Sequence, residues 1–198
     1  MTGPDVEKLF SRIARLKAAI AEKRGAGAEW DYSFPDGTMT TYRITKVKPP
    51  EVVADELEQV FVWAWTLKDY LKELAASAGR PAQSVENLVN SDSNLQLCAD
   101  LANREKHARL KQSRSGKFAK LGKPRYTVPQ EGIGALLVTP SPVVIDVSKP
   151  ELVELRVPIE NELGAVVGDA LDVLDGVVGN WEQLFADLSR SPQPSREN

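Results

Sequence analysis

The sequence predicts a mainly helical α+β fold, with a bundle of three to four long helices and a small antiparallel β-sheet at one end. Apolar residues recur every three or four positions over several long segments, a spacing typical of amphipathic helices. Shorter segments rich in Thr, Tyr, Ile and Val lie between glycines and prolines, a pattern typical of strands and turns.

The composition favours one soluble domain. A chain of 198 residues with 42% hydrophobic residues can bury a sizeable core. We therefore expect a single domain over residues 1–190 and a disordered, polar tail over residues 191–198. No apolar run approaches ~18 residues, the N-terminus lacks a signal pattern, and the single cysteine cannot form an internal disulfide. We expect a cytoplasmic protein with no membrane partner.

The first half of the chain alternates helix and hairpin. Pro4 suits a first helical position, and helical periodicity continues until Gly25, which predicts a helix of about five turns. Residues 30–47 change to a period of two around a Pro-Asp-Gly-Thr turn, which predicts a β-hairpin. A long helix over residues 50–77 and a short helix over residues 81–90 follow.

The long helix carries more apolar surface than one stripe needs. Trp63, Trp65 and Tyr70 lie outside the row of aliphatic residues that would face the core. Such an excess is typical of a central helix or of one that contacts a second copy of the chain. We therefore expect a homodimer.

The second half is predicted to hold four strands and a last helix. Residues 125–129, 133–139, 142–147 and 152–157 have strand composition and are separated by glycine and proline turns. Together with the early hairpin they would form the small sheet. Apolar residues at helical spacing then predict one helix over residues 158–188, although its four glycines must be held by packing.

Residues 93–109 are predicted to form a helix that contains the only cysteine and the only histidine. On this helix Asp100, Asn103, Arg104 and His107 share an arc of roughly 100°. Cys98 lies among leucines, and burial disfavours a thiolate nucleophile, so Cys98 is predicted to belong to the core.

This helix carries a resemblance to a known family. It contains the pattern C-x-D-x-x-N-x-x-K-H and follows an aromatic helix, FVWAWTLKDYLKE, and a linker, VENLVNSD. Together these segments resemble a group of bacterial and phage proteins akin to the HEPN superfamily (higher eukaryote and prokaryote nucleotide-binding). The resemblance covers residues 50–112 and the last helix, about half of the chain.

The resemblance implies a helical domain that dimerises, and a metal-independent ribonuclease of a toxin or phage-defence system, with an antitoxin or other protein as partner. HEPN ribonucleases carry R-x(4–6)-H near the dimer cleft. This chain departs from that pattern, because Arg104 lies only three residues before His107.

The four polar residues suit RNA cleavage. His107 would act as general base or acid, since an imidazole exchanges a proton near neutral pH. Arg104 would stabilise charge on the phosphorane, Asn103 would orient the histidine or the phosphate, and Asp100 would pair with Arg104 or fix the imidazole. The same set also suits a structural hydrogen-bond network that ties the helix end to the sheet, or binding without chemistry. All three interpretations remain open from the sequence.

A basic segment follows from Arg104 to Arg125. It holds nine lysines and arginines and one acid, a net charge of +8, whereas the rest of the chain carries −11. Segregated charge indicates a polyanion such as RNA or an acidic protein partner. The residues predicted to bind nucleic acid are Lys106, Arg109, Lys111, Arg114, Lys117 and Lys120. The alternative is a non-catalytic dimerisation and protein-interaction module with a basic docking loop. No metal-ligand pattern or phosphate loop occurs, so we expect neither metal nor cofactor.

Overall fold

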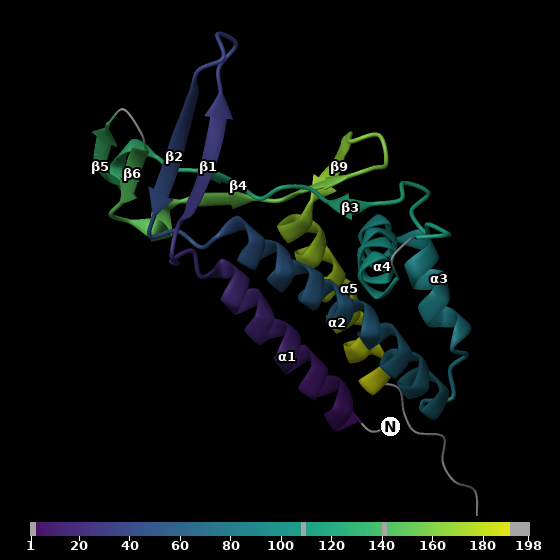
Figure 1. The fold of residues 1–198 in the computed structure, drawn as a ribbon. Helices are drawn as coiled ribbons and strands as arrows, with labels where there is room; N and C mark the ends of the chain where they lie inside the picture. The colour runs from purple at the N-terminus through teal and green to yellow at the C-terminus, as the bar shows by residue number, and fades with distance from the viewer. Residues whose placement is uncertain (1–2, 108–109, 140–141, 191–198) are drawn as a thin grey trace, which may run out of the picture. The chain divides into compact units, whose positions relative to one another are not determined.

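The computed structural model describes residues 3–107, 110–139 and 142–190 (Figure 1). The expected disordered tail, residues 191–198, and Arg109 lie outside these residues. The described residues form five α-helices and nine strands in three sheets. The fold is an α+β mixture, and the prediction of a three- to four-helix bundle with one small sheet is wrong.

The described residues group into two compact units. Unit 1 takes residues from 3–17, 57–122 and 158–190, and unit 2 takes residues 18–56 and 123–157. Both units are built from separate stretches of the chain, and two of the four boundaries fall inside the first two helices. A compact unit is defined by internal contacts and not by independent folding, so the single domain stays a prediction.

Four of the predicted helices are confirmed, with small changes at their ends. They are α1 (Gly3–Ala21), α2 (Pro50–Ser77), α3 (Gln83–Ser91) and α4 (Ser93–Lys106). Helix α4 stops at Lys106, because His107 takes an extended backbone with φ −136° and ψ 131°. None of the helices described is both long and apolar enough to cross a membrane.

The core of unit 1 lies around α2 and the last helix, α5 (Ala170–Ser189). Trp181 of α5 is fully buried, and its Nε1 donates to the carbonyl oxygen of Ala64 at 2.9 Å. Phe10 of α1 contacts Phe185, with ring centroids 5.7 Å apart. These contacts join helices that are distant in the sequence into one hydrophobic core.

The prediction of one helix over residues 158–188 is wrong in its first third. Residues 158–169 form strands β8 (Pro158–Glu160) and β9 (Val166–Asp169), and α5 begins at Ala170. The Asn161 side chain accepts from the backbone N–H groups of Leu163 and Ala165, and Gly164 takes a φ of +79°, so the chain turns back sharply. Asp169 then caps α5 by accepting from Leu171 N–H at 3.0 Å.

The predicted strands form two sheets and not one, and a third sheet is made of strands that the sequence did not predict. In unit 2, strands β1 (Ala28–Ser33), β2 (Met39–Thr45), β6 (Val143–Val147) and β5 (Ile133–Val138) form a sheet in that order, in which β2 and β6 are parallel. Strands β4 (Arg125–Thr127) and β7 (Glu154–Arg156) pair separately. In unit 1, β3 (Lys120–Leu121), β8 and β9 form the third sheet.

Unit 2 has its own small core, made of Ile44, Val47, Val147 and Val153. Beside it Lys48 is buried, and its Nζ donates to Glu56 Oε2 at 2.8 Å and to the carbonyl oxygen of Ala19. The Tyr126 hydroxyl donates to the carbonyl oxygen of Lys48. Burial, with Glu51 and Glu56 nearby, raises the pKa of Tyr126 to about 12, so this hydroxyl keeps its proton at ordinary pH.

Two of the three aromatic residues that predicted a dimer contact on α2, Trp63 and Trp65, make contacts within the chain. Trp65 is 6% exposed and contacts Lys68 and Arg114, and the Arg12 guanidinium lies 4.1 Å from the ring centroid of Trp63. Such cation–π contacts occupy surface that a second copy would otherwise cover.

Candidate functional site

The candidate site is built on α4 and on residues 110–119, here called the basic loop, which return against α4; both lie within unit 1. Helix α4 begins after Asp92, whose carboxylate accepts from Leu95 N–H at 2.8 Å. Its apolar side is buried, and Cys98 points inward, with Sγ 3.8 Å from the carbonyl oxygen of Phe61. Burial raises the pKa of the Cys98 thiol, so Cys98 stays protonated and belongs to the core as predicted.

Asp100 holds the basic loop from inside. It is only 1% exposed, yet its carboxylate accepts from the hydroxyls of Ser113 and Ser115, both at 2.5 Å, and from Arg114 N–H at 2.7 Å. Ala119 N–H adds a longer contact at 3.5 Å. A buried carboxylate is costly unless donors surround it, and here the loop supplies them. Asp100 therefore organises the loop.

Arg104 holds the far end of the same loop. Its Nε donates to the carbonyl oxygen of Ala119 at 3.1 Å, and its Nη2 donates to that of Phe118 at 2.9 Å. Phe118 has a φ of +51°, a left-handed conformation that is rare for a bulky residue. The backbone N–H of Phe118 donates to the hydroxyl oxygen of Ser113 at 3.0 Å. The guanidinium of Arg104 and the Ser113 hydroxyl thus fix a strained turn.

His107 and Asn103 lie together but apart from these contacts. Both line a surface hollow with Leu110, Lys111 and Gln112, and His107 is exposed. The helical arc predicted from the sequence is therefore divided into two pairs. Asp100 and Arg104 bind the loop, whereas Asn103 and His107 face the hollow.

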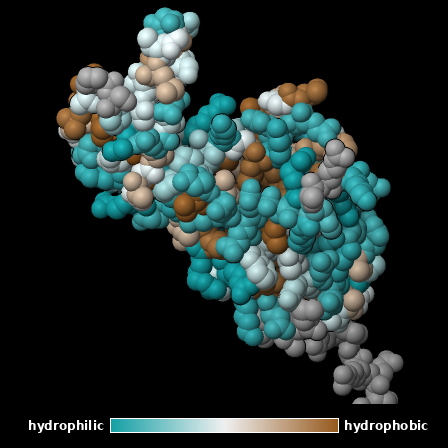
Figure 2. All heavy atoms as spheres, in the orientation of Figure 1, coloured by the Kyte–Doolittle hydropathy of each residue, from teal (hydrophilic) through white to brown (hydrophobic). Residues whose placement is uncertain are grey.

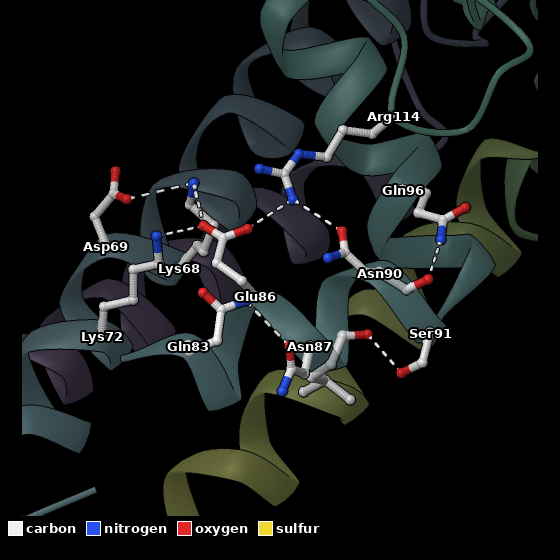
Figure 3. Close-up of polar contacts among 11 residues, drawn as sticks. Lys68, Asp69, Lys72, Gln83, Glu86, Asn87, Asn90, Ser91, Gln96 and Arg114 are labelled. Carbon is white, nitrogen blue, oxygen red and sulfur yellow. Dashed lines mark hydrogen bonds and ion pairs between the residues drawn. The ribbon is translucent and has the colours of Figure 1, made fainter. Parts of the chain in front are cut away.

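A second acidic residue fixes the loop from another side (Figure 3). Glu86 of α3 accepts from Arg114 Nη1 at 2.7 Å, and it also pairs with Lys68 and Lys72 of α2. Burial raises the pKa of Glu86, but the hydrogen bonds from Lys72 and Arg114 and the charge of Lys68 outweigh it and lower the value to about 2. Asn90 accepts a weaker contact from Arg114 at 3.4 Å.

The sequence analysis missed the cluster of Glu86, Lys68 and Lys72. Lys68 and Lys72 are one helical turn apart and share a face, a spacing readable from the sequence. Nothing in the sequence indicated that Glu86 of another helix would lie between them and Arg114.

The residues predicted to bind nucleic acid do not form one uniform patch. Lys106, Lys111 and Lys117 are exposed, and no side-chain hydrogen bond or ion pair of theirs is found among the described residues. Arg114 is bound to Glu86, and Lys120 lies 3.7 Å from Glu160. The exposed, uncompensated charge is therefore concentrated on three lysines.

Across the residues that the structure describes, no group of three or more His, Cys, Asp or Glu side chains is placed to hold a metal ion. Comparison of the chain with protein-family models, with curated proteins and with solved structures found no match.

Proposed function

We propose that this chain is a HEPN-like protein that binds the phosphate backbone of RNA through the end of α4 and the basic loop that follows it. One observation carries the proposal: Asp100 and Arg104 hold residues 113–119 against α4, and Lys106, Lys111 and Lys117 stay exposed without a counter-charge in the described structure. Residues 113–119 are already held before binding and so lose little conformational entropy on binding, and each lysine can release a counterion from a phosphate.

The test is the salt dependence of RNA binding, measured by fluorescence anisotropy with a labelled single-stranded RNA. Affinity should fall with salt at a log–log slope of about −0.7 per phosphate neutralised, so about −2 for three lysines. Replacing Lys106, Lys111 and Lys117 by glutamine should flatten this slope by about 2. The control replaces Lys8, Lys23 and Lys149, which removes the same charge elsewhere. Equal loss in both variants, or tight binding unaffected by the first, would reject the loop as the contact.

RNA cleavage is a second candidate, favoured by the shared hollow of His107, Asn103 and Lys111. In this proposal His107 takes the 2′-hydroxyl proton, the 2′-oxygen bonds to phosphorus, and the bond from phosphorus to the 5′-oxygen breaks. The proton passes from the imidazolium to that oxygen, which leaves a cyclic phosphate and a 5′-hydroxyl. Lys111 would stabilise the phosphorane charge, because Arg104 is committed to loop carbonyls.

We further propose a cytoplasmic location and a protein partner, such as an antitoxin that covers the basic loop. An acidic partner would suit the same three lysines by charge complementarity.

A further inference from the structure

The two edges of the four-stranded sheet of unit 2 differ in charge. The β1 edge, AEWDYS, carries Glu29 and Asp31, whereas the β5 edge, IGALLV, has no charged residue. Natural proteins protect edge strands with charge, since unpaired backbone groups invite another strand. Within the described residues β5 pairs only with β6, so its outer side is unprotected.

The exposed side chains of β5 continue an apolar face across the sheet. One row of cross-strand neighbours runs over the four strands through Trp30, Tyr42, Val143 and Val138. In this row the rings of Trp30 and Tyr42 stack with centroids 5.7 Å apart. Leu136 belongs to a parallel row with Ile145, Ile44 and Ala28. Val138 and Leu136 are 74% and 58% exposed, so this face ends at open apolar residues. Figure 2 shows apolar atoms at this margin, where Figure 1 places β5.

We propose that β5 pairs antiparallel with β5 of a second copy of this chain. The pairing would join two sheets into one of eight strands, with the charged β1 edges outermost. Pairing of β1 in this way would bring Glu29 and Asp31 of the two copies close together, opposite or diagonal to one another, where like charges repel. β5 meets its own copy with only apolar side chains, so it is complementary to itself.

The bulge at the start of β5 selects the register. Pairing with β6 shifts between Ile133 and Ala135, at Gly134, so this end of the strand is irregular. A two-fold axis perpendicular to the sheet pairs residues of the same face. Centring it on Leu137 keeps the bulge out of the contact and places Leu136 opposite Val138 of the second copy. The row from Trp30 to Val138 then runs on into the apolar row of the partner sheet.

Sedimentation velocity tests the pairing, from low to high micromolar concentration of the full chain. A single strand contact is small, so the wild-type chain should pass from 21.7 kDa toward twice that mass over this range. Leu136→Lys with Val138→Lys places like charges opposite each other and should raise the dissociation constant by about tenfold or more. The control, Leu163→Lys with Val166→Lys, changes two exposed apolar residues of unit 1 and should dimerise as the wild type does.

Cysteine cross-linking gives a second test that needs no loss of association. Leu137→Cys would face itself across the axis, and the native Cys98 is buried, so background oxidation should be low. Mild oxidation should give a disulfide dimer with Leu137→Cys and not with Val166→Cys. A wild-type chain that stays monomeric at high micromolar concentration overturns the proposal, because β5 then does not pair with a second copy. A dimer that resists the lysine pair and gives no Leu137→Cys cross-link also overturns it, since the contact then lies elsewhere.

Discussion

Asp100 and Glu86 hold the same loop, but they do so with different chemistry. Asp100 is buried and binds hydroxyl and backbone N–H groups of residues 113–119, and within the described part of the chain no lysine or arginine side chain hydrogen-bonds to it. Glu86 is partly accessible and binds three cations, Lys68, Lys72 and Arg114. The first arrangement depends on exact donor geometry and the second on charge. The hydrogen bonds to Asp100 therefore determine the backbone conformation of the loop, and the ion pair of Glu86 with Arg114 holds the loop against α2 and α3.

The largest expected effect comes from Asp100→Ala. This change leaves the hydroxyls of Ser113 and Ser115 and the Arg114 N–H without their acceptor, at a cost of about 3 kcal/mol in the free energy of unfolding. Urea denaturation followed by circular dichroism measures it. Asp175→Ala is the control, because Asp175 is exposed and makes a surface pair with Lys17, which should contribute about 0–1 kcal/mol. Equal stability of the two variants would show that Asp100 does not support the loop.

A smaller effect, dependent on pH, is expected at Glu86. Its pKa is lower in the folded chain, about 2 against 4.5, so its contribution is fully present above pH 4.5 and is lost as the pH falls toward 2. Glu86→Gln should reduce stability at pH 7 by about 1–2 kcal/mol and should flatten the pH dependence between 4.5 and 2. Thermal melting across that range measures both. Parallel pH profiles for the variant and the wild type would contradict the ion-pair role.

The smallest effect on stability is expected at His107, and this separates it from Arg104. His107→Ala removes an exposed side chain and should change the free energy of unfolding by less than about 0.5 kcal/mol. Arg104→Ala removes two hydrogen bonds to loop carbonyls and should cost about 1–2 kcal/mol.

The rate of RNA cleavage is the second measurement for His107. His107→Ala should lower the cleavage rate by roughly 10²-fold or more at unchanged stability. The Asn103→Ala variant serves as a neighbour in the same hollow, where a smaller loss is expected. A stable His107→Ala protein that cleaves at the wild-type rate would end the catalytic proposal and leave the binding proposal standing.

Parts of this site were predictable from the sequence. The helix that carries it and the core position of Cys98 follow from periodicity and apolar neighbours. The pairing of Asp100 with Ser113 and Ser115 was not predictable, since serines in a polar loop carry no signal of their partner. A structural network was among the interpretations left open, but it was expected to include His107, which lies apart from it.

The sequence by itself determined the elements whose cause is local. Helices α1 to α4 and the first hairpin follow from side-chain periodicity and turn residues, which act between neighbours a few positions apart. Only the tertiary structure decided the rest. Residues 158–169 have helical spacing, but pairing with β3 and the turn at Gly164 make them strands. The parallel pairing of β2 with β6 joins segments about 100 residues apart. Such contacts depend on surfaces that exist only after the chain has folded, so no local pattern records them.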